Sequence, residues 1–249
     1  MKVVGLWRYP VKSLQGEAVA SATVERDGVA GDRTWGIRDE STGRILTARR
    51  RPPLLEAAAA YDDGMPVVTL PDGSVLRGPG RQTDAALSDW LAMPVSLVSS
   101  AGDEGRAEFF ADATDDTSEA IEFTMPEGRY VDAAPLLVLT TASLRTGEGL
   151  HPEGDWSPRR FRPNLLVDAD GDGWLEDDWV GQRVLAGEVE LRPAEPCVRC
   201  TMVTRPQPGL EADVDVFRTL ARHHRGRFGV WSDVVVPGTL TVGDEVRPS

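Results

Sequence analysis

Residues 228–242 read FGVWSDVVVPGTLTV, and this stretch near the carboxyl end decides the expected fold. It holds two short apolar runs, residues 228–236 and 239–242, which the turn-forming dipeptide Pro237-Gly238 separates. Runs of this length, rich in valine and interrupted by proline and glycine, are typical of β-strands joined by a tight turn. We therefore predict a β-hairpin here.

The same pattern of short apolar runs between turns extends toward the amino end of the chain. It predicts a hairpin from residues 35–38 and 44–48, and further strands at residues 3–8, 18–24, 54–61, 67–70, 74–76, 135–140, 164–168, 184–185 and 189–191. Helices are predicted at residues 84–93 with Asp84 as the capping residue, near Ser143, and at residues 213–224. Many short strands with few helices predict a mainly β (α+β) protein, built from barrels or a sandwich.

An acidic segment rich in small residues separates two parts of the chain. Residues 99–120 read SSAGDEGRAEFFADATDDTSEA and show only weak periodicity, so we expect them to connect two lobes. The prediction is a smaller β-rich domain at residues 1–98, followed by a larger domain at residues 99–249.

Charge and composition exclude several classes of function. The 27 basic residues are outnumbered by 40 acidic ones, a net charge of −13, which argues against binding to a nucleic-acid backbone. No apolar run reaches the ~18 residues that cross a bilayer, and the amino end lacks the features of a secretion signal. Two cysteines cannot form a disulfide scaffold. We expect a globular cytoplasmic protein that binds neither nucleic acid nor membrane.

The biased composition makes two residues stand out. Lys2 and Lys12 are the only lysines among the basic residues, and Asn164 is the only asparagine. Because the bias otherwise replaces these residue types, Lys12 and Asn164 are candidates for a specific role.

The segment Cys197-Val198-Arg199-Cys200 is the most pointed chemical feature. Four interpretations remain open: a structural zinc site, a dithiol redox centre, a single thiolate that binds a soft metal next to an arginine, and two small buried hydrophobic residues. No second cysteine pair is present to complete a zinc site, and Pro196 rather than a helix start precedes the first thiol.

A second basic segment, residues 160–164 (RFRPN), precedes an expected strand. In an extended segment alternate side chains face the same way, so Arg160 and Arg162 are expected to project together. Two such guanidiniums suit a phosphate or another planar anion, and the alternative is a solvated strand end.

Three further segments place cations or hydroxyl groups next to expected strands. They are Lys12-Ser13, the sequence GDR that ends at Arg33, and TTASL at residues 140–144. Where a strand passes into a helix, as at residues 140–144, the backbone N–H groups can bind an anion. Ordinary helix capping explains the hydroxyl groups at this place as well.

Together these segments resemble the MOSC family, the molybdenum cofactor sulfurase C-terminal domains, which include amidoxime-reducing components. PVKSL, GDR, TTASL, RFRPN and the C-x-R-C segment occur here in the family's order, and the match covers essentially the whole chain. The resemblance implies a MOSC β-barrel domain at residues 99–249 and a smaller, N-terminal β-rich domain at residues 1–98 associated with it.

The resemblance also implies a site. Cys200 matches the family's molybdenum ligand and is the expected catalytic residue. The expected cofactor-binding residues are Lys12, Ser13, Arg33, Thr140, Ser143, Arg162, Asn164 and Arg199.

The implied cofactor is the molybdenum cofactor, Mo-molybdopterin. We do not expect pyridoxal phosphate, since only Lys2 and Lys12 could form a Schiff base. The expected function is a molybdenum-dependent oxidoreductase that reduces N-hydroxylated or N-oxide small molecules. Electrons are expected from a separate iron–sulfur, flavin or haem protein, because no fused iron–sulfur segment follows the last strands. The alternatives are a non-catalytic cofactor carrier and a sulfur-transfer protein.

Overall fold

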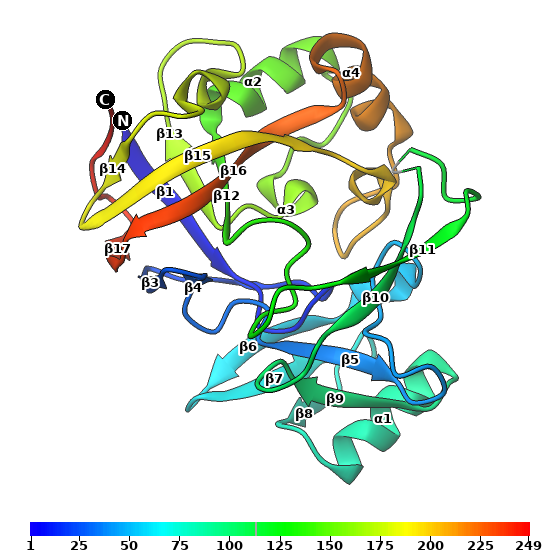
Figure 1. Cartoon of the computed structure of the whole chain (residues 1–249). Helices are drawn as coiled ribbons and strands as arrows, with labels where there is room; N and C mark the ends of the chain where they lie inside the picture. Colours follow the sequence, from blue (N-terminus) through cyan, green and yellow to red (C-terminus); the bar gives the residue numbers. More distant parts are fainter. Residues whose placement is uncertain (113) are drawn as a thin grey trace. The chain divides into compact units, whose positions relative to one another are not determined.

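The computed structural model describes residues 1–112 and 114–249, and the chain forms two compact units (Figure 1). Unit 1 combines residues 1–7 and 18–30 with residues 133–249, and unit 2 contains residues 8–17 and 31–132. Neither unit is therefore a single continuous stretch of the chain. The domain boundary between residues 98 and 99 stays a prediction.

The main sheet of unit 1 has eight strands in the order β18-β14-β15-β16-β12-β13-β1-β2 (Figure 1). Strands β12 and β13 run parallel, whereas β13 pairs with β1, and β12 with β16, in antiparallel fashion. The strands are β1 (Lys2–Arg8), β2 (Glu17–Ala18), β12 (Leu136–Thr140), β13 (Leu165–Asp168), β14 (Val184–Ala186), β15 (Val189–Val198), β16 (Arg227–Val236) and β18 (Val246–Pro248).

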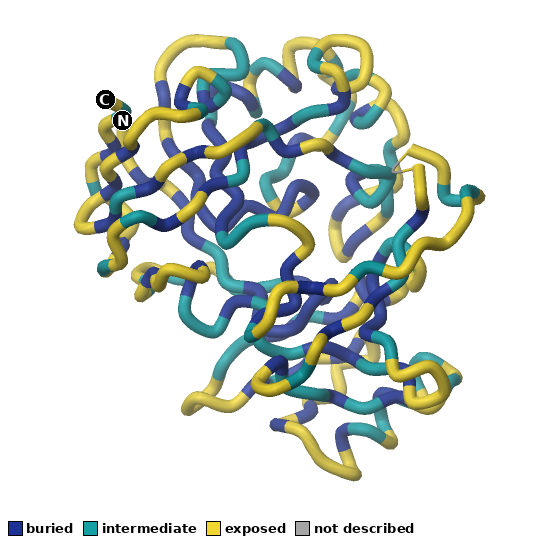
Figure 2. The backbone as a smooth tube through the Cα atoms, viewed as in Figure 1, coloured by how far each residue is buried: buried dark blue, intermediate teal, exposed yellow. Residues whose placement is uncertain are grey.

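The core of unit 1 lies on this sheet. All five residues of β12 are buried, as the dark segments of Figure 2 show, because this strand lies in the middle of the sheet. Leu136 and Val138 pack on one hydrophobic cluster with residues of β13 and β16, while Leu139 packs on a second cluster with Trp156 and Phe228. The central strand thus contributes side chains to two cores.

The remaining elements of unit 1 are short helices and a small sheet. Asp213 caps α4 by accepting hydrogen bonds from the backbone N–H groups of Asp215 (2.8 Å) and Val216 (3.3 Å), so the helix predicted at residues 213–224 is confirmed. The helices are α2 (Thr141–Leu150), α3 (Pro158–Phe161), η2 (Leu175–Trp179), η3 (Thr201–Thr204) and α4 (Val214–His224), and the small sheet has the order β17 (Gly238–Thr241), β3 (Ser21–Glu25), β4 (Gly28–Val29).

The hairpin predicted over residues 228–242 is wrong, although both of its strands exist. Strand β16 pairs with β15 and β12, whereas β17 leaves the main sheet and pairs with β3. Pro237 and Gly238 therefore turn the chain from one sheet to another. Strand pairing depends on contacts between distant segments, which a local pattern does not contain.

The described part of unit 2 consists of small antiparallel sheets, one α-helix and one short 3-10 helix. The elements are β5 (Trp35–Asp39) paired with β9 (Val95–Ser99), the sheet β6 (Ala58–Asp62), β7 (Met65–Thr69), β8 (Val75–Arg77), the hairpin β10 (Arg106–Phe110) and β11 (Ala120–Thr124), the short η1 (Pro52–Glu56), and α1 (Arg81–Leu91). Together with unit 1, they confirm the expected mainly β fold with a few helices.

The structure corrects three local predictions in unit 2. Strand β5 pairs along its length with β9, and with residues 44–48 it forms the antiparallel bridge Arg38–Ile45, with backbone hydrogen bonds from Asp39 to Arg44 (2.9 Å) and from Leu46 to Ile37 (2.8 Å). The predicted hairpin is therefore present only as a short contact. Residues 99–120 do not simply connect two lobes, since β10 and the start of β11 lie in them and belong to unit 2; Ala113 lies outside the described residues. Asp84 does not cap the helix predicted at residues 84–93. Helix α1 begins earlier, at Arg81, and the carboxylate of Asp84 accepts the backbone N–H of Leu97 at 2.9 Å.

Arg225 ends α4 in the left-handed conformation, with φ of 55°. A side chain in this conformation costs about 1 kcal/mol, which glycine avoids. We expect Arg225→Gly to stabilise the protein by about 1 kcal/mol, measured as the free energy of unfolding in urea. Arg222→Gly in the same helix is the control and should destabilise by about 1 kcal/mol. Destabilisation by both variants would contradict the prediction.

Candidate functional site

Backbone conformation marks three of the predicted site residues. The described residues other than glycine include six with positive φ, among them Ser13 (72°), Arg33 (52°) and Arg162 (58°). Arg162 ends α3, and Ser13 and Arg33 lie in turns; that of Ser13 is closed by a hydrogen bond from the backbone N–H of Leu14 to the carbonyl of Val11 at 3.3 Å. Left-handed residues other than glycine are uncommon, and strained residues concentrate at functional sites. This observation is independent of the motifs that singled these residues out.

Within unit 2 the structure brings Lys12 and Arg33 to the same short segment. The Lys12 ammonium donates to the backbone carbonyl of Tyr130 at 2.9 Å and forms an ion pair with Asp132. The carbonyl of Arg33 accepts the backbone N–H of Tyr130 at 2.8 Å. Lys12 is buried although it carries a charge, so the segment from Tyr130 to Asp132 holds it in place.

The guanidinium of Arg33 keeps its charge. It forms an ion pair with the buried Asp32 and lies over the ring of Tyr9, 5.0 Å from the centroid. Burial alone would lower the pKa of Arg33, but the negative charges of Asp32 and Asp132 outweigh it and raise this pKa above its ordinary value. Ser13, next to Lys12, accepts the backbone N–H of Ala48 at 3.0 Å.

Within unit 1 the two cysteines have different surroundings. The two cysteines are not joined in a disulfide; Cys197 is buried near the end of β15, and Cys200 is partly exposed just before η3. The guanidinium of Arg199 donates to the sulfur of Cys197 at 3.0 Å and to the carbonyl of Phe161 at 2.7 Å. Its Nε–H group is buried and has no hydrogen-bond partner among the described residues. Arg199 thus joins the segment of Cys200 to the residue before Arg162.

Asn164 and Arg162 follow Phe161 and are both buried. The side-chain oxygen of Asn164 accepts the N–H of Leu137 at 3.2 Å, and its amide donates to the carbonyl of Trp7 at 3.3 Å. Asn164 therefore joins strands β12 and β1 at the point where β13 begins. Asn164, which the composition bias singled out, thus has a structural role in unit 1.

Arg160 does not project together with Arg162, and that prediction is wrong. Residues 158–161 form a helical turn instead of an extended segment, and Arg160 is 0% exposed. Its guanidinium donates to the carbonyls of Asp155 (2.9 Å), Val203 (3.0 Å) and Glu211 (3.0 Å). Arg160 is thus a structural residue that fixes η3, directly after Cys200.

Thr140 and Ser143 lie against a buried acid that the sequence did not single out. Both hydroxyl groups donate to the same oxygen of Glu176, each at 2.6 Å, and Thr140 also caps α2 by accepting the N–H of Ser143. The second oxygen of Glu176 has no hydrogen-bond partner among the described residues. Burial raises the pKa of Glu176 above its ordinary value, against the lowering effect of the two hydroxyl groups.

The raised pKa of Glu176 predicts a pH-dependent stability. Above the unfolded-state value of about 4.5, the folded protein holds a proton that the unfolded chain has lost, so this group stabilises the fold less as the pH rises. In Glu176→Gln that dependence disappears. We expect the free energy of unfolding of the variant, relative to the native protein in the same buffer, to rise from pH 4.5 upward. A constant difference across pH, from urea titrations, would contradict this.

No three of the histidine, cysteine, aspartate and glutamate side chains described form a group that could hold a metal ion. No helix in the described part of the chain is long and apolar enough to cross a membrane. The cytoplasmic location stays a prediction.

Comparison with known families identifies the class of protein. The family model described as "MOSC N-terminal beta barrel domain" matches residues 1–116, and the model described as "MOSC domain" matches residues 126–247. This chain belongs to the MOSC family, as the order of its motifs indicated.

Two relatives match nearly the whole chain. It is 30% identical to mitochondrial amidoxime-reducing component 1 of Mus musculus, over 98% of this chain and 81% of that protein. It is 28% identical to mitochondrial amidoxime reducing component 2 of Homo sapiens, over 98% of this chain and 82% of that protein. Among solved structures, the YUAD protein from Bacillus subtilis matches with a TM-score of 0.49 and 14% identity over 98% of this chain and 93% of that chain, too little to add to the assignment.

Proposed function

We propose that this chain binds the molybdenum cofactor and reduces N-hydroxylated or N-oxide compounds with electrons from a separate donor protein. The observation that carries the proposal is the 30% identity, over 98% of this chain, to a protein named as an amidoxime-reducing component. The net reaction consumes two electrons and two protons, breaks the N–O bond, and releases water. A small organic substrate and an iron–sulfur, flavin or haem donor are the partners that this reaction needs.

The residues present fit such a cofactor. Cys200 offers a free, partly exposed thiol, the type of ligand that soft metals prefer. Arg199, beside it, has a buried Nε–H group without an acceptor among the described residues, and an acceptor atom of a bound ligand would satisfy it. The cofactor, when bound, supplies the two-electron redox centre, and the protein supplies position and charge.

The remaining predicted residues would hold the anionic part of the cofactor. Arg33 is permanently charged, and Lys12 and Arg162 add positive charge in a chain whose net charge is −13. Guanidinium groups bind phosphate through paired hydrogen bonds, so Arg33 and Arg162 are the proposed phosphate ligands. Ser13 and Asn164 are proposed to orient the pterin. Asn164 would do so indirectly, by fixing the ends of the strands that its side chain joins.

Thr140 and Ser143 are proposed to act indirectly. Their hydroxyl groups bind Glu176, so the geometry supports a positioning role at the start of α2 rather than direct contact with a ligand. In this proposal Glu176 holds the strand-to-helix passage in one conformation.

The test is elemental analysis combined with an activity assay. The full chain is expressed in a host that makes the molybdenum cofactor, and its molybdenum content is measured. Reduction of an amidoxime is then followed with an artificial low-potential electron donor. We expect molybdenum bound near one atom per chain, together with formation of the amidine. Bound molybdenum without turnover would instead support a cofactor carrier, and absence of molybdenum would overturn the proposal.

A further inference from the structure

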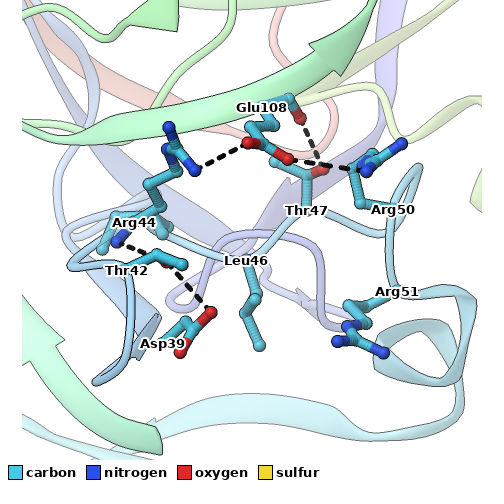
Figure 3. Close-up of a pocket in the computed structure, with 9 residues that line it drawn as sticks. Asp39, Thr42, Arg44, Leu46, Thr47, Arg50, Arg51 and Glu108 are labelled. Carbon is cyan, nitrogen blue, oxygen red and sulfur yellow. Dashed lines mark hydrogen bonds and ion pairs between the residues drawn. The ribbon is translucent and has the colours of Figure 1, made fainter. Parts of the chain in front are cut away.

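We propose that a pocket in unit 2 binds a small organic anion, at a site separate from the residues assigned to the cofactor. The pocket has a volume of about 380 Å³ and is lined by Arg44, Arg50, Arg51, Asp39, Glu108 and Leu46, among others (Figure 3). We call it the arginine pocket. Its volume lies in the range of pockets that bind small molecules.

The lining of the arginine pocket holds three arginines and two carboxylates, whereas the whole chain carries −13. Arg44 also forms an ion pair with Glu122, at 3.0 Å, so the positive charge offered to a ligand comes from Arg50 and Arg51. Both carboxylates are already occupied. Asp39 accepts hydrogen bonds from Ser41 and Thr42, at 2.6 Å and 2.9 Å from their hydroxyl groups. Its carboxylate therefore closes its own turn and forms no ion pair with an arginine among the described residues.

Glu108 holds two of the arginines in position. Its carboxylate lies 2.7 Å from the guanidinium of Arg44 and 3.5 Å from that of Arg50, so it bridges the two sides of the pocket (Figure 3). Its backbone carbonyl accepts the hydroxyl of Thr47 at 3.3 Å. The bridge spreads one negative charge over two cations and fixes both near the pocket.

Arg50 and Arg51 lie on the side of the pocket opposite Arg44 (Figure 3). Arg50 lies over the ring of Phe110, 4.7 Å from its centroid, which stiffens a long side chain. The backbone N–H of Arg51 donates to the carbonyl of Thr47 at 2.8 Å, while its exposed guanidinium makes no hydrogen bond or ion pair with the residues described. The guanidinium of Arg50 is thus held in place, that of Arg51 is available to a ligand, and both residues line the arginine pocket.

This arrangement selects the chemistry of the ligand. Guanidinium groups bind carboxylates and phosphates through paired, charge-assisted hydrogen bonds. The buried Ile45 and Leu46 add apolar lining next to these cations. The ligand class is therefore an organic carboxylate or a phosphate monoester with a short apolar part.

The proposal does not depend on the cofactor. None of the six named lining residues is among those assigned to the molybdenum cofactor, and all lie in unit 2. The backbone N–H of Ala48, in the loop that carries Arg50 and Arg51, donates to the side-chain hydroxyl of Ser13. Occupancy of the pocket can thus be measured whether or not the protein is loaded.

The experiment is isothermal titration calorimetry of the full chain with three probes that share an aromatic ring. Phenyl phosphate and benzoate carry the two anionic groups, and benzamide is the neutral control. The test variant is Arg50→Gln with Arg51→Gln, and the matched control is Arg81→Gln, an exposed arginine at the start of α1 outside the pocket. All variants are checked for unchanged thermal unfolding.

We expect at least one anion to bind, with affinity that falls as salt is added, and benzamide not to bind. The double variant should bind at least about tenfold more weakly, since it loses hydrogen bonds to a charged group, while the control stays within about twofold. The anion that binds more tightly tells a phosphate ligand from a carboxylate ligand. Binding of neither anion, equal binding of benzamide, or an equal effect of Arg81→Gln would overturn the proposal.

Discussion

Replacing Cys200 with serine is expected to lower the proposed reductase activity by more than about 100-fold, while the protein stays folded. Loss of residues that only support a metal site already costs about 10- to 100-fold, and Cys200 is the proposed direct sulfur ligand. Its side chain is partly exposed, so the substitution leaves no buried cavity. The measurements are amidoxime turnover and molybdenum content of the purified variant, with thermal unfolding as the check on folding.

Cys197→Ser is the matched control, because the two cysteines are three positions apart and differ in their contacts. The sulfur of Cys197 accepts a hydrogen bond from Arg199 at 3.0 Å, and a serine hydroxyl can also accept it. We expect activity within about tenfold of the native protein, since Arg199 keeps an acceptor. Equal losses in both variants would favour a dithiol or zinc site and contradict the assignment of Cys200.

Arg160→Met is expected to destabilise unit 1 by about 3 kcal/mol or more. The guanidinium of Arg160 is fully buried and donates to three carbonyls, which methionine would leave without donors at about 1 kcal/mol or more each. For a chain of this length, that loss lowers the midpoint of thermal unfolding by roughly 10 °C. Calorimetry measures the shift, and limited proteolysis tests whether residues 201–211 loosen.

Arg159→Met provides the comparison, since Arg159 is the exposed neighbour of Arg160 and, among the residues described, donates to the carbonyl of Pro208 alone, at 2.9 Å. An exposed substitution of this kind should change the free energy of unfolding by less than about 0.5 kcal/mol. Similar unfolding midpoints for the two variants would show that the three buried hydrogen bonds of Arg160 do not stabilise the fold.

Local sequence signals predicted elements better than they predicted partners. The apolar runs at residues 135–140 and 67–70 correspond to β12 and β7, and the helix predicted at residues 213–224 corresponds to α4. The pairings failed where they were non-local: β5 pairs with β9 and β17 pairs with β3. The alternation of apolar and polar residues along a strand indicates which face is buried, but it does not indicate which distant strand forms the hydrogen bonds.

The candidate site shows the same difference between position and role. The motifs led to Ser13, Arg33 and Arg162, and all three have the unusual positive φ. They did not reveal that Glu176 binds Thr140 and Ser143, because one glutamate in an acidic segment has no local signature of burial. Nor did alternation distinguish Arg160 from Arg162, since Pro158 begins a helical turn there.

The division of unit 1 into separate chain segments has a consequence for synthesis on the ribosome. Strand β1 is made first, yet Lys2 pairs with Asp168, so the strand must wait until most of the chain has emerged. All residues of unit 2, in contrast, are available once Asp132 has left the exit tunnel. Contacts between such distant residues slow folding. We therefore expect unit 2 to acquire structure co-translationally, and β1 to need protection from aggregation until its neighbour arrives.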